Sequence, residues 1–404
     1  MLNSFLVHVP RNSRWWRWLV QLADWCRQWP WIYPRGIEAS ARKWLTRSQN
    51  RTEWYASLRG DWYQEANPGG LSIHPPPAEL PAVARRHFRQ VATLRYPPSA
   101  VFHFAGASLV SNEGLVLTRD NRVLAEFSHY FNTRTLRAAI RSRPFPLVKT
   151  HVARVDESVG LLAAPQGWNY YHWIFDVLPR LGLLDQWRGV IEKYAIPDRL
   201  SAAQIESLRL LGVSESQLLR LQPDTRLRCE RLYAPSLPGS EGCYPPWSLA
   251  YLRSTFLPHA VRTPGRGPLI YIVRGPAAQR PILNETELIA CLERRGFSPV
   301  RLETYGFLEQ VAIFRDAQVV VAAHGAGLAN LVFSSRTALL ELFSADYLRP
   351  DCYFTLARQA AHPYDCWVDQ SPAGAGRPWG AISVPLDVIE SKVTQLRTLV
   401  ERGP

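Results

Sequence analysis

The chain has 404 residues, of which 47% are hydrophobic and 20% are charged, and its formal net charge is +13 at pH 7. This composition is typical of a folded globular protein and excludes a disordered chain, while the length suggests two domains. No apolar run is long enough for a membrane-spanning helix and the N-terminus lacks the order of a cleavable signal, so we expect a cytoplasmic protein.

The first 63 residues predict a basic, tryptophan-rich helical arm. Positions 1–60 hold ten Lys or Arg, three Asp or Glu and eight of the fifteen tryptophans. Within residues 14–31, Trp15, Trp18 and Trp25 share one helical face. Such a face suits an anionic membrane surface, which here would be the inner face of the plasma membrane. Alternatively, it packs on the body of the protein or on a second copy in a homodimer. No nucleic-acid-binding signature accompanies the charge, so we expect no nucleic-acid partner.

The six cysteines predict neither disulfides nor a metal site. They are scattered, none forms a CxxC pair, and no zinc-binding spacing occurs. The positions are Cys26, Cys229, Cys243, Cys291, Cys352 and Cys366.

Residues 64–100 are rich in Pro and Gly and predict a connector. Residues 101–257 predict an N-terminal α/β domain that begins with short hairpin strands at 101–131 and has a buried strand at 158–164. A helical pattern at 169–185 contains Pro179, which should kink or interrupt it.

A linker at 258–268 leads to a C-terminal domain at 269–404. Apolar strands at 269–274, 298–303, 318–323 and 338–343 alternate with helices at 284–295 and 307–317, which predicts a parallel sheet covered on both faces. We expect Asn284 to cap the first of these helices and Gly296 to end it. We also expect a C-terminal helix that packs back on the first domain.

The segment HGAGLAN, residues 324–330, follows a strand and opens a helix. Ligands of parallel sheets bind at the carboxyl ends of strands, and a helix start offers unpaired N–H groups to a diphosphate. Gly325 and Gly327 would let the backbone approach a phosphate, and His324 could donate a hydrogen bond. The alternative is a tight strand-to-helix turn without a ligand.

Three charged residues accompany this loop. Arg274 and Arg280 follow the first strand and are either phosphate-binding forks or solvated loop residues. Glu341 lies in an apolar strand, where a carboxylate needs a partner, either ribose hydroxyls or an internal arginine.

His172 and Asp176 stand at i and i+4 on one helical face of the run NYYHWIFDVLPRL. His172 could be a general base that Asp176 orients, or Asp176 could be the base itself. An ordinary structural pair is the alternative.

These runs resemble glycosyltransferase family 61, including its bacterial capsular polysaccharide biosynthesis members. The carrying segments are residues 169–181, 271–288, 296–310 and 317–343. The resemblance implies a GT-B fold of two facing Rossmann-like domains, with the donor bound by the second and the acceptor by the first. It implies an inverting transfer from a nucleoside-diphosphate sugar without an essential metal or other cofactor.

Carried over to this sequence, the resemblance makes Asp176 or His172 the base. The residues implied in donor binding are Arg274, Arg280, Asn284, His324, Gly325, Ala326, Gly327, Leu328, Asn330 and Glu341. The expected activity is transfer of a hexose or pentose to a glycan or lipid-linked acceptor in surface polysaccharide synthesis. The alternative is a non-catalytic subunit of a membrane-associated assembly complex that binds nucleotide sugar or glycan.

Overall fold

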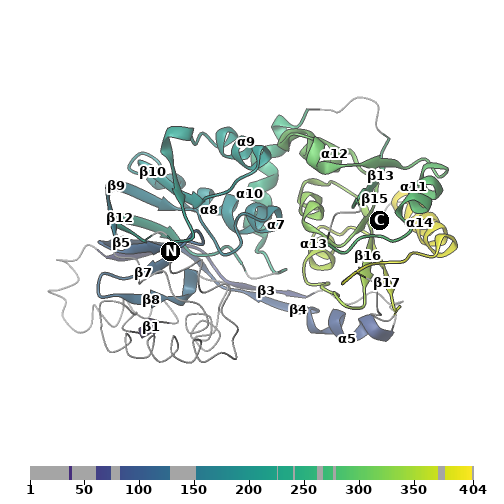
Figure 1. Ribbon diagram of the computed structural model, residues 1–404, viewed down its shortest axis with the longest axis horizontal. Helices are drawn as coiled ribbons and strands as arrows, with labels where there is room; N and C mark the ends of the chain where they lie inside the picture. The colour runs from purple at the N-terminus through teal and green to yellow at the C-terminus, as the bar shows by residue number, and fades with distance from the viewer. Residues whose placement is uncertain are drawn as a thin grey trace, which may run out of the picture.

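The computed structural model describes residues 36–38, 61–73, 82–127, 152–224, 226–239, 242–261, 267–275, 279–371 and 378–402. Within these ranges the chain forms two lobes side by side, each built around a β-sheet (Figure 1). The expected arm helix at residues 14–31 lies outside the described residues, and so does Cys26.

The sheet of the N-terminal lobe has ten strands in the described residues and is mixed. β9, β10, β11 and β12 run parallel to one another, while β5 and β6 pair antiparallel with β12. The lobe is therefore Rossmann-like only in its parallel part, since hairpin strands complete the sheet. The strands are β1 (Gly36–Glu38), β2 (Trp62–Asn67), β5 (Ser99–Ala105), β6 (Ser108–Val110), β7 (Leu115–Leu117), β8 (Arg122–Leu124), β9 (Ala153–Leu161), β10 (Lys193–Pro197), β11 (Leu218–Leu221) and β12 (Arg226–Pro235).

The interruption expected at Pro179 is present and takes the form of a π-turn. Helix α7 (Tyr170–His172) continues into the π-helix η3 (Trp173–Val177), and α8 (Leu178–Leu183) follows. The N–H of Leu178 bonds the carbonyl of Trp173, five residues back. Pro179 has no backbone N–H and cannot donate an i to i−4 hydrogen bond. The helix changes from π to α geometry at this point, where that hydrogen bond cannot form.

The remaining helical segments of this lobe lie between its strands or, for the last two, after β12. They are η1 (Ala125–Phe127), η4 (Asp185–Trp187), α9 (Ala202–Leu210), η5 (Glu215–Gln217), α10 (Pro246–Phe256) and η6 (Leu257–His259).

The described part of the expected connector, residues 64–73 and 82–100, contains strands and a helix that the prediction did not include. A ribbon of β3 (Gly70–Ile73) and β4 (Thr93–Tyr96) flanks helix α5 (Ala82–Gln90), which reaches the second lobe (Figure 1). Phe88 is buried there, with its ring 5.0 Å from Phe354 and 6.0 Å from Tyr364. The apolar signal of α5 is weak in the sequence because arginines separate its two buried residues, Ala84 and Phe88.

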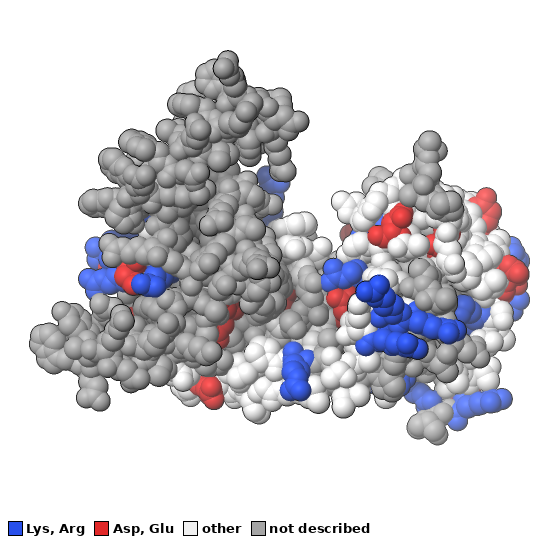
Figure 2. All heavy atoms as spheres, turned by 90° about the horizontal axis from the view of Figure 1, so that it is seen from below, with Lys and Arg blue, Asp and Glu red and all other residues white. Residues whose placement is uncertain are grey.

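Seen from the side of α5, blue Lys and Arg side chains gather around this end of the molecule (Figure 2). Arg85, Arg86 and Arg89 of α5 are exposed, and the helix carries no acidic side chain.

The C-terminal lobe confirms the expected parallel sheet. Its strand order is β14-β13-β15-β16-β17, and every neighbouring pair is parallel. The strands are β13 (Leu269–Ile272), β14 (Ser298–Val300), β15 (Val319–Ala323), β16 (Ala338–Ser344) and β17 (Tyr364–Asp369). Helices α11 (Glu285–Glu293), α12 (Phe307–Asp316), α13 (Tyr353–Gln359) and α14 (Leu386–Glu401) and the 3-10 helices η7 (Leu302–Thr304) and η8 (Ala326–Phe333) connect or cover them.

Two expectations for this lobe need correction. The C-terminal helix α14 packs on the sheet of its own lobe, because its buried residues Ile389, Val393 and Leu396 join the apolar cluster formed by β13, β15 and β16. Asn284 makes no side-chain cap at α11, since its amide exchanges two hydrogen bonds with the backbone of Val384. Gly296 does end that helix region with a positive φ of 84°.

One apolar cluster extends through both lobes and fixes their arrangement. At its centre Phe256 of α10 packs edge-on against Phe307 and Phe333 of the C-terminal lobe, with ring centroids 4.8 and 6.1 Å away. The five cysteines in the described ranges are free thiols, as expected. No helix among the described residues is long and apolar enough to cross a membrane.

Candidate functional site

A cavity of about 590 Å³ lies between the lobes at the carboxyl ends of β13 and β15. The chain order of the sheet reverses between these strands, because β14 lies on one side of β13 and β15 on the other. Such a switch point is where open parallel sheets bind their ligands. The N-terminal lobe supplies part of the wall, through Tyr170, Ser201, Ala202, Ala203 and Glu206.

The glycine loop forms one wall of this cavity through Gly325, Gly327 and Leu328. A Cβ on Gly325 would overlap Nη1 of Arg274, and one on Gly327 would lie 2.6 Å from Cδ1 of Leu302. The backbone of Gly325 is extended, so close approach and not strain requires glycine here. The helix that we expected after the loop is present as η8, which is a 3-10 helix.

Arg274 lies in the cavity as expected, whereas Arg280 is not among the described residues that line it. The guanidinium of Arg274 donates from Nε and Nη2 to the carbonyl of Gln279, at 3.1 and 2.6 Å. Burial lowers the pKa of Arg274, and the positive charge of Arg280 lowers it further. Nη1 of Arg274, beside Gly325, is therefore the part of this fork that faces the glycine loop.

Arg280 braces the glycine loop. Its Nη2 donates to the carbonyl of His324 at 3.3 Å, and its guanidinium lies 4.4 Å from the centre of the Tyr347 ring. Arg280 adopts a positive φ of 62°, a conformation that a non-glycine residue rarely takes and that the surrounding contacts must hold.

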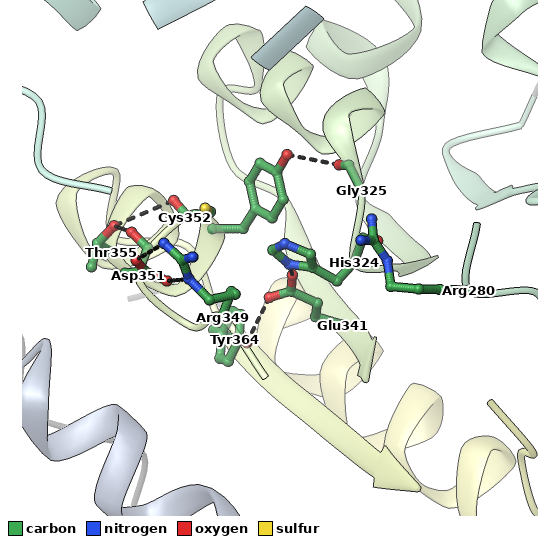
Figure 3. A network of polar contacts seen from close by, with 10 residues as sticks. Arg280, His324, Gly325, Glu341, Arg349, Asp351, Cys352, Thr355 and Tyr364 are labelled. Atoms are coloured by element: carbon green, nitrogen blue, oxygen red, sulfur yellow. Dashed lines mark hydrogen bonds and ion pairs between the residues drawn. The ribbon is translucent and has the colours of Figure 1, made fainter. Parts of the chain in front are cut away.

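The Glu341 carboxylate is buried beneath His324, and its partners are His324 and Tyr364, not an internal arginine (Figure 3). Oε1 of Glu341 lies 2.6 Å from Nδ1 of His324, and Oε2 accepts a 2.7 Å hydrogen bond from the Tyr364 hydroxyl. Burial, together with the charge of Glu341, holds the pKa of Tyr364 well above its usual range. This network orients the His324 ring, so Glu341 supports the loop from below.

Tyr353 and Asn330 hold the backbone of the same loop. The Tyr353 hydroxyl donates to the carbonyl of Gly325 at 2.7 Å, and Nδ2 of Asn330 donates to the carbonyl of Gly327 at 3.2 Å (Figure 3 shows the first contact). Asn330 is fully buried and, like Ala326, is not among the described residues that line the cavity. Of the ten expected donor residues, Arg274, Gly325, Gly327 and Leu328 line it.

The expected pair of His172 and Asp176 is formed. Nδ1 of His172 lies 2.7 Å from Oδ2 of Asp176, and Oδ1 of Asp176 accepts a 3.1 Å hydrogen bond from the Tyr244 hydroxyl. The Asp176 side chain is wholly buried, whereas 8% of the His172 side chain is exposed. His172 is therefore the more exposed member of the pair, and neither residue is among the described residues that line the cavity.

Aromatic rings connect the two histidine–carboxylate pairs across the lobe boundary. The Tyr171 ring lies 5.3 Å from His172 and 5.7 Å from Tyr353, and the Tyr353 ring lies 5.2 Å from His324. Sequence reasoning missed this aromatic layer, because Tyr353 lies far from both histidines along the chain. The alternation of strands and helices in the sequence does not show which buried tyrosines make hydrogen bonds.

Arg180 was also missed, and its role is structural. It is fully buried and donates to the carbonyls of Pro235 and Ala163, both at 2.6 Å. Burial lowers the pKa of Arg180 to about 9, against the opposite effect of the Asp176 carboxylate. Arg180 thus fastens α8 to the sheet behind the His172–Asp176 pair.

A family model described as Glycosyltransferase 61 matches residues 170–340, which run from α7 into β16, include His172, Asp176 and His324, and end one residue before Glu341. The chain is also similar to the EGF domain-specific O-linked N-acetylglucosamine transferase of Drosophila melanogaster, with 33% identity over 123 residues, which are 28% of this chain and 23% of the fly protein. The proteins of the same name from Xenopus laevis and Rattus norvegicus are 36% and 35% identical over 94 residues, 22% of this chain and 18% of theirs. The chain thus aligns with less than a quarter of each relative.

Proposed function

We propose that this chain is an inverting glycosyltransferase that moves a sugar from a nucleoside-diphosphate sugar to a hydroxyl group of a glycan or lipid-linked acceptor. The cavity at the switch point carries the proposal, because a parallel sheet edge with a glycine loop and an arginine suits a diphosphate. Its volume of about 590 Å³ is in the range of small-molecule sites. The family match over the same residues supports the choice of a sugar nucleotide.

In this proposal the leaving diphosphate is stabilised by Arg274 and by backbone N–H groups that begin at Gly325. These groups carry the charge compensation that a metal ion supplies in other phosphate sites. The relatives are named for transfer of N-acetylglucosamine, so we propose this sugar as the first donor to test.

On the acceptor side we propose His172 as the general base. The acceptor oxygen attacks the anomeric carbon, the bond from that carbon to the diphosphate oxygen breaks, and Nε2 of His172 takes the hydroxyl proton. Asp176 orients the ring through Nδ1 and stabilises the imidazolium that forms. The diphosphate leaves with the bonding electron pair, and because the acceptor oxygen attacks from the opposite face, the anomeric configuration inverts.

We further propose that the acceptor belongs to surface polysaccharide synthesis at the inner face of a membrane. The basic, tryptophan-rich composition of residues 1–60 supports this location.

A thermal-shift panel tests the donor site. Uridine, guanosine and cytidine diphosphates and their sugars should include one that raises the melting temperature with concentration. Arg274→Ala should abolish that shift, whereas Arg154→Ala, which removes an exposed arginine of the N-terminal sheet, should preserve it. If none of the nucleotides stabilises the protein, the donor site is wrong.

Release of nucleoside diphosphate in the presence of acceptor glycans then separates a transferase from a binding subunit. A protein that binds the nucleotide sugar but transfers it to no glycan, lipid-linked acceptor or water would support the non-catalytic alternative.

A further inference from the structure

A second, shallow cavity of about 370 Å³ lies in the N-terminal lobe, among residues that the donor site does not use. Its wall combines Trp247 and Tyr251, one turn apart on α10, with amide and carboxylate side chains from β2 and from the end of α8. These polar residues are Gln64, Asn67, Asp185 and Gln186. We call this the α10 groove.

We propose that the α10 groove binds a neutral saccharide, as the subsite for an acceptor glycan that extends from His172. Partly exposed aromatic rings offer flat apolar faces to the C–H faces of a sugar, and amide and carboxylate groups pair with its hydroxyls. The identification of this saccharide as part of the acceptor substrate rests on the proposed function.

The charge of the groove favours a neutral ligand over a second nucleotide. No Lys or Arg is among the described residues that line it, whereas Glu65 and Asp185 contribute carboxylates. Asp185 is paired with Arg188 at 2.7 Å. A diphosphate there would lie beside two carboxylates, one of which already engages Arg188, and this is unfavourable for a second anion.

Tyr251 adds an unsatisfied polar group. Its hydroxyl oxygen is buried near the guanidinium of Arg188, and its proton has no acceptor among the described residues. Burial raises the pKa of Tyr251, and the nearby Arg188, which lowers it, is a donor only and cannot accept the hydroxyl proton. A sugar hydroxyl in the groove would supply an acceptor.

The backbone holds this ring in place. A Cβ on Gly182 would lie 2.7 Å from Cε2 of Tyr251, so a glycine in α8 is needed for the ring to lie against the helix. The same helix begins directly after the π-turn that contains Asp176. Trp247 follows Tyr244, the hydrogen-bond partner of Asp176, by three residues. The groove and the His172–Asp176 pair are therefore built on the same two segments: the helical run from α7 to α8, and the stretch from Tyr244 to Tyr251.

Saturation-transfer NMR on the full chain tests the α10 groove with chitotriose, cellotriose, xylotriose and maltotriose as probes. We expect at least one of them to bind and Trp247→Ala to weaken its binding roughly tenfold. Tyr251→Phe keeps the ring, removes the hydroxyl and should weaken binding several-fold. Trp168→Ala, which removes an exposed tryptophan of the same lobe that does not line the groove, should leave binding unchanged.

If Trp247→Ala fails to fold, Trp247→Phe and Gln186→Ala replace it. The proposal would be overturned if none of the four saccharides showed saturation transfer, or if the groove variants and the wild type showed the same saturation transfer. Preferential binding of an unglycosylated peptide would also overturn it. Uridine and guanosine diphosphate binding, measured on the same samples, reports on the donor site separately. Saccharide binding without nucleotide binding would keep the groove and reject the transferase, and the reverse result would reject the groove alone.

Discussion

The Tyr170 hydroxyl donates a 2.7 Å hydrogen bond to Oδ1 of Asn330 and thereby joins the two lobes at the wall of the cavity between them. Nδ2 of Asn330 continues the connection to Oε1 of Gln310 at 3.1 Å, and Nε2 of Gln310 donates to the carbonyl of Leu302 at 3.0 Å. One buried hydrogen-bond chain therefore links α7 to η7 and η8, both of which border the cavity. Networks of this kind hold a site in one arrangement when every member is satisfied.

Tyr170→Phe should reduce the free energy of unfolding by about 1–2 kcal/mol, because it leaves the buried Oδ1 of Asn330 without its donor. It should also weaken nucleotide binding several-fold, since the loops around the cavity lose their common brace. Urea denaturation and nucleotide titration measure the two effects. A double-mutant cycle with Asn330→Ala should reveal coupling, and strictly additive losses would show that the bond does not join the lobes.

His172→Gln should lower kcat by roughly 10²–10⁴-fold while leaving the Kd for the nucleotide sugar unchanged, as expected for loss of a general base. Asp176→Asn should also lower kcat, because an amide can donate to Nδ1 of His172 and favour the wrong tautomer. Initial rates at saturating donor, paired with donor titrations, give both numbers.

Tyr244→Phe provides the matched control for this pair. It removes a second hydrogen bond to Asp176 but leaves the His172 contact in place, so kcat should change far less than in Asp176→Asn. Full activity in His172→Gln would assign the base elsewhere.

The C-terminal lobe was predictable because its strands are continuous apolar runs that alternate with helices, and a parallel sheet follows from that pattern. The same reasoning located the cavity edge, since Arg274 and Gly325 end neighbouring strands. It could also place His172 beside Asp176, because the i, i+4 spacing is a local property of a helix.

The partners of buried polar groups could not be predicted. Glu341 was recognised as a carboxylate that needs a partner, but its pairing with His324 and Tyr364 depends on strand register across β15, β16 and β17. Helix α5 was missed for a related reason, since its burial depends on a surface that the second lobe supplies. Tertiary contacts, and not local periodicity, decided each of these cases.

Gly325→Ala should weaken nucleotide diphosphate binding by roughly ten- to a hundredfold, because the new Cβ displaces the Arg274 guanidinium and removes charge-assisted hydrogen bonds. Stability should change little, since the extended backbone of residue 325 accepts any residue. Calorimetric titration and a melting curve measure the two effects. Gly189→Ala is the matched control because nothing lies within 4 Å of its Cβ position, and equal affinity in the two variants would contradict a phosphate site at Gly325.

His362 should make the protein less stable in mild acid. Its side chain is buried, Nδ1 accepts the N–H of Thr337 at 3.3 Å, and Nε2 has no hydrogen-bond partner among the described residues. Burial lowers the pKa of His362 from 6.5 to about 4, and the positive charge of Arg253 adds to the effect. As the pH falls below 6.5 the unfolded chain takes up a proton that the folded chain refuses until about pH 4.

The contribution of His362 is therefore fully present above pH 6.5 and is lost as the pH falls to about 4. That shift corresponds to about 3 kcal/mol of unfolding free energy. His362→Asn removes the titration, while its amide oxygen can still accept the N–H of Thr337. Urea denaturation at a series of pH values should thus give a shallower loss of stability for His362→Asn than for the wild type between pH 6.5 and 4. Parallel curves would mean that a proton reaches the folded His362 as easily as the unfolded one, and the ring would then not be held neutral by the packing around β17.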